Sequence, residues 1–150
     1  MAHGMTDLER LQAIEEIRRL KASRDHALDR KDWVTYAAVH APDHVSHNDG
    51  HALQSSPEEV IDGLKAALDG VTTCHQSHTP NITFDAPDKV SMVWSMEDNL
   101  WWKQDDGDHW LHGFGFYHEK CEKRNGEWLF TYRRLERIQV MTSPGARLNK

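Results

Sequence analysis

The spacing of apolar side chains divides the chain into a helical first half and a strand-like second half. Over residues 7–29 they recur at steps of three or four, which predicts one long amphipathic helix with Lys21 on its solvent face. Asp25 and Asp29 share a face near its C-terminus, where an acid is either solvated or functional. Thr6 and Glu9 fit a capping box at its start. Two shorter helices and two short strands are predicted next, at residues 33–40 and 57–69 and at residues 44–48 and 51–54.

From residue 72 the apolar period becomes two, which is typical of strands. Four long strands are predicted, at residues 72–86, 89–103, 109–123 and 128–141. Asn125-Gly126, between the last two, is a strong hairpin signal. Because these strands are segregated from the helices, the predicted fold class is α+β. We expect a curved, cone-shaped, mixed or antiparallel sheet wrapped around the N-terminal helices as an α+β barrel.

A single domain is expected over residues 1–150, with an ordered core at 6–141 and a loose tail at 142–150. The last strand carries bulky apolar residues on both of its faces, for example Trp128 on one and Leu129 on the other. A sheet with only one covered face should not show this pattern. The second face is therefore predicted to be the subunit interface of a homo-oligomer.

Composition and charge narrow the choice of partners. The net charge is −6, whereas phosphate binding requires a basic face, so nucleic acid is not an expected partner. No apolar run approaches the ~18 residues of a membrane span. The first ten residues have no apolar export core, which favours a cytoplasmic location. Cys74 and Cys121 are then interpreted as reduced thiols.

Two histidines, His75 and His78, lie in the first long strand, where apolar residues are typical. A titratable pair inside a sheet is costly unless it is hydrogen-bonded or used. Asp29, near the end of the first helix, and Arg133, in the last strand, are candidates to join them. A neutral imidazole can remove a proton near pH 7, a carboxylate can orient it, and a guanidinium can stabilise a developing oxyanion. Elimination of water by these groups requires no metal and no cofactor.

The chain has 11 histidines, but no HExxH or HxxxH motif lies on a predicted helix, so no metal site is expected. His47 and His112 are candidate pocket residues. Most of the others, His40, His109 and His118 among them, are interpreted as surface or interface residues.

Four motifs together resemble a known family: ALDRKDW, APDHV, YHE and RNGEWLF, at residues 27–33, 41–45, 117–119 and 124–130. They are similar to the SnoaL-like group of the nuclear-transport-factor-two-like superfamily, and the resemblance covers about residues 8–140. It implies a cone-shaped pocket that relatives use for many different tasks.

Within this superfamily the chain looks most like the branch of scytalone dehydratase, bile-acid 7α-dehydratase and hexachlorocyclohexane dehydrochlorinase. Those enzymes use a His–Asp dyad as base without a cofactor. The resemblance implies that Asp29 is the dyad acid and that Arg133 is the basic residue of the pocket. Arg24 falls where the dehydrochlorinase has a pocket lysine. The branch also implies a trimer ahead of a dimer.

Two histidines compete for the place of the base. Counting back from Asp88 places the family histidine at His75, whereas counting back from Asn81 favours His78 or its neighbour. His78 also shares strand parity with Ile82. We retain both and give His75 the preference.

The sequence therefore predicts a cofactor-independent lyase acting on a small hydroxylated, aromatic molecule. Water loss is the expected reaction, and the resemblance extends to a lyase that couples hydroxyl loss to formaldehyde release from lignin-derived diaryl compounds. An isomerase or polyketide cyclase, and a binding module without chemistry, are the alternatives. The residues expected to contact the substrate are Arg24, His47, Trp94, His112 and Tyr117.

Overall fold

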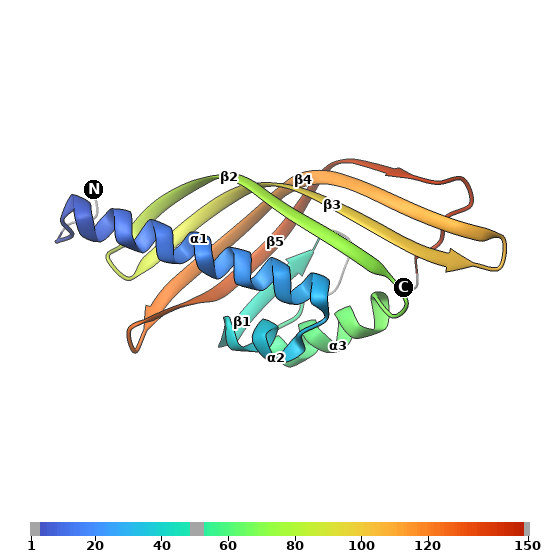
Figure 1. Cartoon of the computed structure of the whole chain (residues 1–150). Helices are drawn as coiled ribbons and strands as arrows, with labels where there is room; N and C mark the ends of the chain where they lie inside the picture. Colours follow the sequence, from blue (N-terminus) through green and yellow to red (C-terminus); the bar gives the residue numbers. More distant parts are fainter. Residues whose placement is uncertain (1–3, 49–52, 149–150) are drawn as a thin grey trace.

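The computed structural model describes residues 4–48 and 53–148 (Figure 1). Its helices are α1 (Asp7–Arg30), α2 (Trp33–Ala38) and α3 (Pro57–Ala67). Its strands are β1 (His40–Asn48), β2 (Thr72–Ala86), β3 (Lys89–Gln104), β4 (Gly107–Arg124) and β5 (Glu127–Thr142). Within these residues, no helix is long and apolar enough to cross a membrane.

Helix α1 begins and ends with local signals that fix its position along the chain. Thr6 accepts a hydrogen bond from the Glu9 amide, and the Glu9 carboxylate accepts one from the Thr6 amide, which is the predicted capping box. At the other end, Lys31 adopts a left-handed conformation with φ of 57°, and its amide bonds back to the helix. This sharp stop leaves Asp29 in the last turn, facing the sheet.

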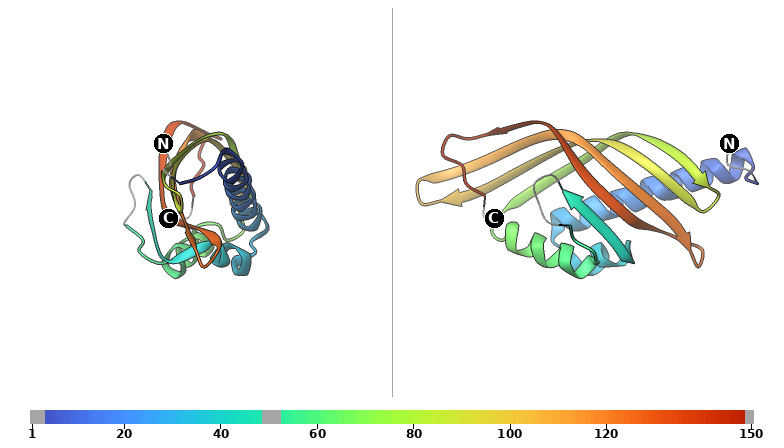
Figure 2. Two further views of the ribbon diagram at one scale, coloured as in Figure 1. Left: turned by 90° about the vertical axis from the view of Figure 1, so that its left-hand side faces the viewer. Right: turned by 180° about the vertical axis from the view of Figure 1, so that it is seen from behind.

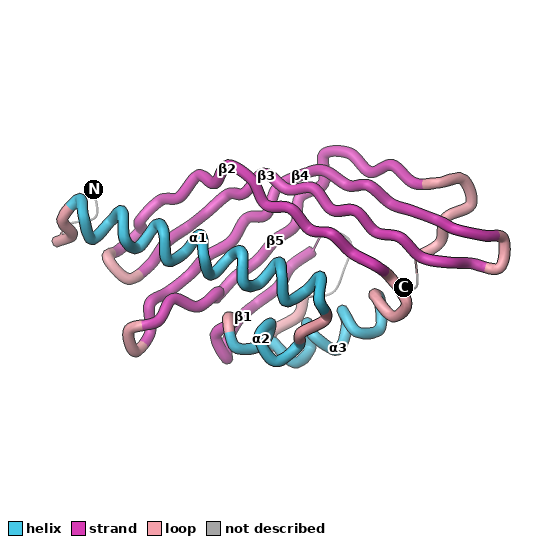
Figure 3. Tube along the Cα trace, in the orientation of Figure 1, coloured by secondary structure: helices cyan, strands magenta, loops and turns pink. Residues whose placement is uncertain are grey.

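The five strands form one sheet in the order β1-β5-β4-β3-β2. Strands β2 to β5 are antiparallel neighbours, whereas β1 pairs with β5 in parallel, so the sheet is mixed. It curves around α1 and does not close, because β1 and β2 remain as its edges (Figures 2 and 3). The predicted α+β fold with a cone-shaped sheet is confirmed, and the barrel is open.

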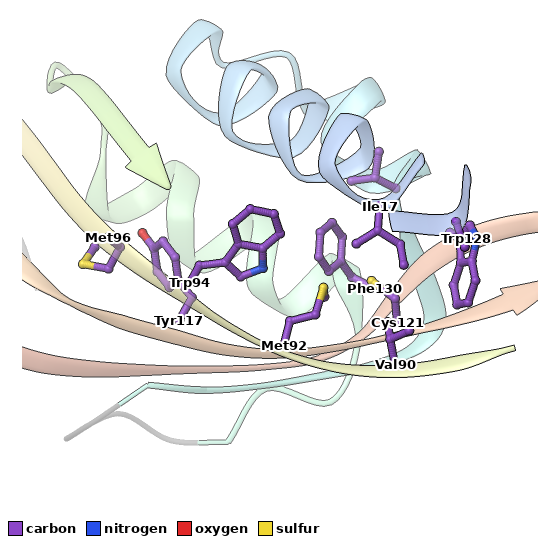
Figure 4. Close-up of a cluster of buried hydrophobic side chains, with 11 residues drawn as sticks. Ile17, Val90, Met92, Trp94, Met96, Tyr117, Cys121, Trp128 and Phe130 are labelled. Atoms are coloured by element: carbon purple, nitrogen blue, oxygen red, sulfur yellow. The ribbon is translucent and has the colours of Figure 1, made fainter. Parts of the chain in front are cut away.

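The core lies between α1 and the concave, inner face of the sheet. Alternate residues of β3 and β4 point inward and pack with Ile17 of α1 and Phe130 of β5 (Figure 4). A second apolar cluster joins the end of α1 to α2, α3 and Leu100 of β3. The two clusters hold α1 at a fixed height above the inner face, so that polar side chains of α1 meet the sheet.

Two boundaries differ from the prediction. Strand β1 begins at His40 instead of His44, because α2 ends at Ala38 and the chain then pairs with β5. The predicted return strand at residues 51–54 lies partly outside the described residues, and Gln54 forms a single antiparallel bridge with Ser46.

Candidate functional site

The centre of the candidate site is a pair formed by α1 and β2. His75 Nδ1 lies 2.7 Å from Asp29 Oδ1, and the His75 amide donates to Asp29 Oδ2 at 2.9 Å. Because a carboxylate only accepts, the imidazole proton resides on Nδ1, and Nε2 keeps its lone pair. Among the described residues, Nε2 has no hydrogen-bond partner. The His75 side chain is 9% exposed and the Asp29 side chain 22%.

Two further residues hold the carboxylate of Asp29. Thr73 donates its hydroxyl proton to Asp29 Oδ1 at 2.9 Å, and Lys31 donates to the Thr73 hydroxyl at 3.0 Å. Asp29 therefore accepts three hydrogen bonds from β2, which fixes both the carboxylate and the tautomer of the imidazole.

A β-bulge decides which histidine faces α1. The register of β2 against β3 shifts between His78 and Asn81, and Thr79 has φ of 32°. Before the bulge, His75 and Ser77 contact α1, and after it Ile82 packs on the core. The extra residue reverses the parity, so the argument that linked His78 to Ile82 is wrong. His78 points to the outer face, where it lies 3.3 Å from Glu97.

One face of α1 carries charges into the core, contrary to the prediction that Lys21 faces solvent. Lys21, Asp25 and Asp29 are spaced four residues apart, and the first two are 1% and 5% exposed. Asp25 accepts a hydrogen bond from Ser77 at 2.6 Å, and Lys21 donates to Glu119 at 2.8 Å. Each charged side chain on this face of α1 is therefore in contact with a polar residue on the inner face of the sheet.

The buried charges shift one another's protonation. Burial lowers the pKa of the Lys21 ammonium, and Asp25 and Glu119 offset only part of this effect. Burial by itself would raise the pKa of Asp25. The cations of Lys21 and Arg24, together with the hydrogen bond from Ser77, outweigh burial and hold that pKa below its usual value.

Arg24 lies beside these charged residues of α1 and is fully buried. It donates to the Tyr36 hydroxyl at 2.8 Å and to His40 Nε2 at 3.2 Å. Burial and the adjacent Arg24 lower the pKa of His40 to about 2, so this imidazole is neutral. His40 is therefore a buried partner of Arg24 within the chain, and its interpretation as a surface or interface residue is wrong.

Arg133 reaches the same interior from β5. Its Nε lies 3.8 Å from Glu119 Oε1, and its Cζ lies 4.3 Å from the centre of the Tyr117 ring. Among the described residues, none of its guanidinium nitrogens makes a hydrogen bond within the usual distance. Tyr117 and Trp94, both predicted to contact a substrate, are cross-strand neighbours on this inner face.

Two other predicted contact residues lie elsewhere. His112 is on the outer face, 3.3 Å from Glu97, and His47 is exposed on β1. The structure does not bring either of them to the dyad. His109 was interpreted as a surface or interface residue, but within a single chain it is only 6% exposed and is bonded to Ser143 and Asp106, so that interpretation is wrong.

An ion pair beside the dyad was missed by sequence reasoning. Asp98 lies directly opposite His75 in the sheet register, and Arg137 of β5 binds it at 2.6 and 2.8 Å. The guanidinium passes over Gly113 of β4, where a Cβ atom would collide with both partners. Gly113 and Gly115 share one parity of a strand that is otherwise bulky, which was the available signal.

Three cavities of the structure lie away from the dyad. One of about 650 Å³ is lined by the turn before β2, the β3–β4 hairpin and the C-terminal segment, with Trp102 and Arg147 among its residues. Two smaller ones open on the outer face and beside the N-terminus. Asp29, His75 and Arg133 line none of these three. In the described ranges, no group of three or more potential ligands is placed to hold a metal ion.

Comparison with known proteins agrees with this architecture. A family model described as a SnoaL-like domain matches residues 9–134, which is most of the chain. The chain belongs to the SnoaL-like family. The family predicted from the four motifs is thereby confirmed.

Solved structures extend the likeness of this SnoaL-like protein to the whole fold. Hexachlorocyclohexane dehydrochlorinase from Novosphingobium barchaimii is 18% identical with a TM-score of 0.81, over 95% of this chain and 97% of that one. A putative scytalone dehydratase from Novosphingobium aromaticivorans is 18% identical with a TM-score of 0.82, over 97% and 96%. A protein of unknown function from Mycobacterium tuberculosis reaches 20% and 0.76, over 91% and 78%. At these identities the likeness establishes the nuclear-transport-factor-two-like fold.

Proposed function

We propose that this SnoaL-like protein is a cofactor-independent lyase whose base is His75, oriented by Asp29. The observation that carries the proposal is the Nδ1–Oδ1 contact of 2.7 Å together with the Nε2 atom left without a partner. A partly buried carboxylate that fixes the tautomer and stabilises the imidazolium gives the imidazole the properties of a general base. Dehydratase and dehydrochlorinase chemistry in proteins of the same fold agrees with this proposal.

The reaction proposed is elimination of water. His75 Nε2 takes a proton from the carbon next to the one that bears the hydroxyl group. The C–H electron pair becomes the new C=C bond, the C–O bond breaks, and the proton of the imidazolium returns to the departing oxygen to give water. A general base contributes ~10²–10⁴-fold to such a step, so positioning and electrostatics must supply the rest.

The electrostatic part is assigned in this proposal to cations of the inner face of the sheet. Arg133 has unused N–H donors in a buried setting, where a guanidinium interacts strongly with a departing oxygen. Arg137 is paired across Gly113 with Asp98, which is the cross-strand neighbour of His75. The Arg137 side chain is 29% exposed. We propose Arg133 for the leaving oxygen and Arg24 as the support that keeps the neighbouring residues in place.

The proposed substrate is a small hydroxylated aromatic compound. Trp94, Tyr117 and Phe130 project from the inner face toward α1 (Figure 4), and such rings favour flat apolar partners. The same base could act on a primary hydroxyl group instead. Removal of that proton would release formaldehyde as the C–C bond breaks, and the electron pair would expel a neighbouring hydroxyl group.

We also propose that the protein forms a homo-oligomer, a trimer ahead of a dimer, through the outer face of the sheet. Trp101 and Trp110 are cross-strand neighbours on that face and are 46% and 41% exposed. Exposed tryptophan pairs are unusual on a monomer. Light scattering after size exclusion tests this proposal, and a monomer would contradict it.

Mass spectrometry of products tests the lyase proposal. The protein is incubated with benzylic alcohols and diaryl 1,3-diols, beside Asp29→Asn, His75→Ala and, as matched control, His78→Ala. Loss of one water by the wild type and the control, but not by the other two, supports a dehydratase. Additional loss of formaldehyde supports the reaction in which a C–C bond is cleaved. Unchanged substrates, or full activity of His75→Ala, would overturn the proposal.

A further inference from the structure

Four neighbouring polar atoms inside the sheet have no hydrogen-bond partner. They are Ser46 Oγ, Arg133 Nε, Glu119 Oε2 and His44 Nε2. Ser46, Arg133 and Glu119 stand side by side on β1, β5 and β4, since Arg133 pairs in register with both of the others. His44 is two residues before Ser46 on the same face of β1, and all four residues are at most 6% exposed. Buried polar groups are nearly always paired, so four such atoms in one place indicate a missing partner.

Two of these atoms are acceptors that require a donor. His44 Nδ1 lies 3.1 Å from the Phe130 carbonyl and therefore carries the proton, which leaves a lone pair on Nε2. Burial and the charge of Arg24 lower the pKa of His44 to about 4, so the ring is neutral at pH 7. Glu119 Oε1 is bonded to Lys21, whereas Oε2 is free. The Ser46 hydroxyl could serve only one of these acceptors.

The Arg133 donors lie beside these acceptors, and this mixture selects the type of ligand. A group that both accepts and donates, namely a hydroxyl, satisfies Arg133 together with Glu119 or His44. A carboxylate would leave the acceptors unpaired and would face the charge of Glu119. The rings of Tyr117 and Phe130 lie next to the row formed by these four residues. Lys21 Nζ, which is bonded to Glu119, is 4.2 Å from the centre of the Tyr117 ring and 5.8 Å from the centre of the Phe130 ring.

Access to the row depends on Lys21. Its ammonium lies on Glu119 at 2.8 Å and over the Tyr117 ring, so it occupies the space in front of the row. A lysine side chain has four rotatable bonds, and burial already disfavours the charge of this one. Its withdrawal along α1 would open the row to a planar ligand.

We propose that Ser46, Glu119, His44 and the Nε–H group of Arg133 form a subsite for a phenolic hydroxyl group that stays on the product, while the Nη donors of the same guanidinium serve the other hydroxyl group, which leaves at His75. This inference rests on the proposed function and names its substrate class: a phenol with a second, eliminable hydroxyl group. Ser46 and His44 are specificity-determining residues in this arrangement.

The test uses two ligands that cannot undergo elimination, 4-ethylphenol and 4-ethylanisole. They differ by one methyl group, which removes the hydrogen-bond donor. Their affinities are measured by calorimetry and tryptophan fluorescence with the wild type, Ser46→Ala, His44→Phe and the outer-face control His112→Ala. We expect the wild type and the control to bind the phenol about tenfold or more tightly than the ether, because a site built to bond a hydroxyl rejects its absence strongly. The preference should fall to below about threefold in Ser46→Ala and His44→Phe.

The outcomes separate this inference from the lyase proposal. Equal affinities in the wild type, binding of neither ligand, or a preference that survives both substitutions would overturn the phenol subsite. Circular dichroism tests whether His44→Phe is folded. Ser46→Ala is a milder substitution at the same subsite than His44→Phe. A phenol preference that persists in His75→Ala, whatever the outcome of the product assay, supports the subsite independently of catalysis.

Discussion

Arg137 and Asp98 form a two-point ion pair that spans the strand between them. Arg137 Nη1 and Nη2 lie 2.6 and 2.8 Å from the two oxygens of Asp98, which is 4% exposed. The pair is possible because β4 has Gly113 at the crossing, with no side chain in the way. Gly113 thus allows Arg137 to bind Asp98, the cross-strand neighbour of His75.

Replacement of Gly113 by alanine should break this pair. The new Cβ would collide with Arg137 Nη1 and Asp98 Oδ1, so the guanidinium must leave and the buried carboxylate loses its partner. We expect a loss of about 1–3 kcal/mol in the free energy of unfolding, measured with urea. The same change in an Arg137→Ala background should cost much less, because the displaced group is already absent. Equal costs in both backgrounds would contradict this explanation.

Substitution of Asp29 by asparagine should abolish most activity while leaving the fold intact. An amide can donate to Nδ1, which places the imidazole proton on Nε2 and removes the base. With a substrate found by the product assay, kcat should fall by about 10²–10⁴-fold, the range of general-base catalysis. His78→Ala, on the outer face, should retain kcat within about threefold, given that surface substitutions rarely matter. A similar loss in both variants would refute the assignment of the base.

Acid should destabilise the protein through its two buried histidines. Burial, with the charge of Arg24, lowers the pKa of His40 to about 2 and that of His44 to about 4, from an ordinary value of 6.5. Below pH 6.5 the unfolded chain binds protons that the folded chain does not, so stability is full above 6.5 and falls as the pH decreases. Two such groups give a slope of ~2.7 kcal/mol per pH unit between about 6 and 4.

Unfolding by urea at several pH values measures this slope. The variant His44→Phe should show about half of it between pH 6 and 4, since one proton-linked group has been removed. The control His78→Ala should keep the full slope, because that side chain is half exposed. A stability independent of pH over this range would contradict the buried neutral state of both rings.

Lys21 should be costly to remove alone and cheaper to remove together with its partner. Lys21→Met leaves Glu119 buried without its nearest cation and leaves Asp25 paired with Arg24 alone, and a broken buried pair typically costs about 3–5 kcal/mol. The double variant Lys21→Met, Glu119→Gln should recover part of this loss, because the carboxylate that lost its nearest cation is then replaced by a neutral amide. Thermal and urea unfolding of the three proteins measures the coupling, and strictly additive losses would argue against the pair.

The sequence by itself determined the elements and their order. Local periodicity was sufficient for the helix at residues 7–29 and for the four long strands, and the Asn125-Gly126 turn was sufficient for the last hairpin. The four family motifs were sufficient for the fold. ALDRKDW lies at the end of α1 and RNGEWLF at the turn between β4 and β5, where a few residues determine the path of the chain, and APDHV and YHE lie within β1 and β4.

Tertiary structure decided which side chains meet. Because of the bulge at Thr79, His75 contacts α1 and His78 points to the outer face, although strand parity favoured His78 for the inner face. Helical spacing placed Lys21 on a solvent-facing stripe, but the sheet curves far enough around α1 to bury it against Glu119. Cross-strand neighbours such as Ser46 and Arg133 are far apart in sequence, and only the register of the strands brings them together. Periodicity is a property of adjacent residues, whereas register, bulges and curvature depend on how distant segments pack.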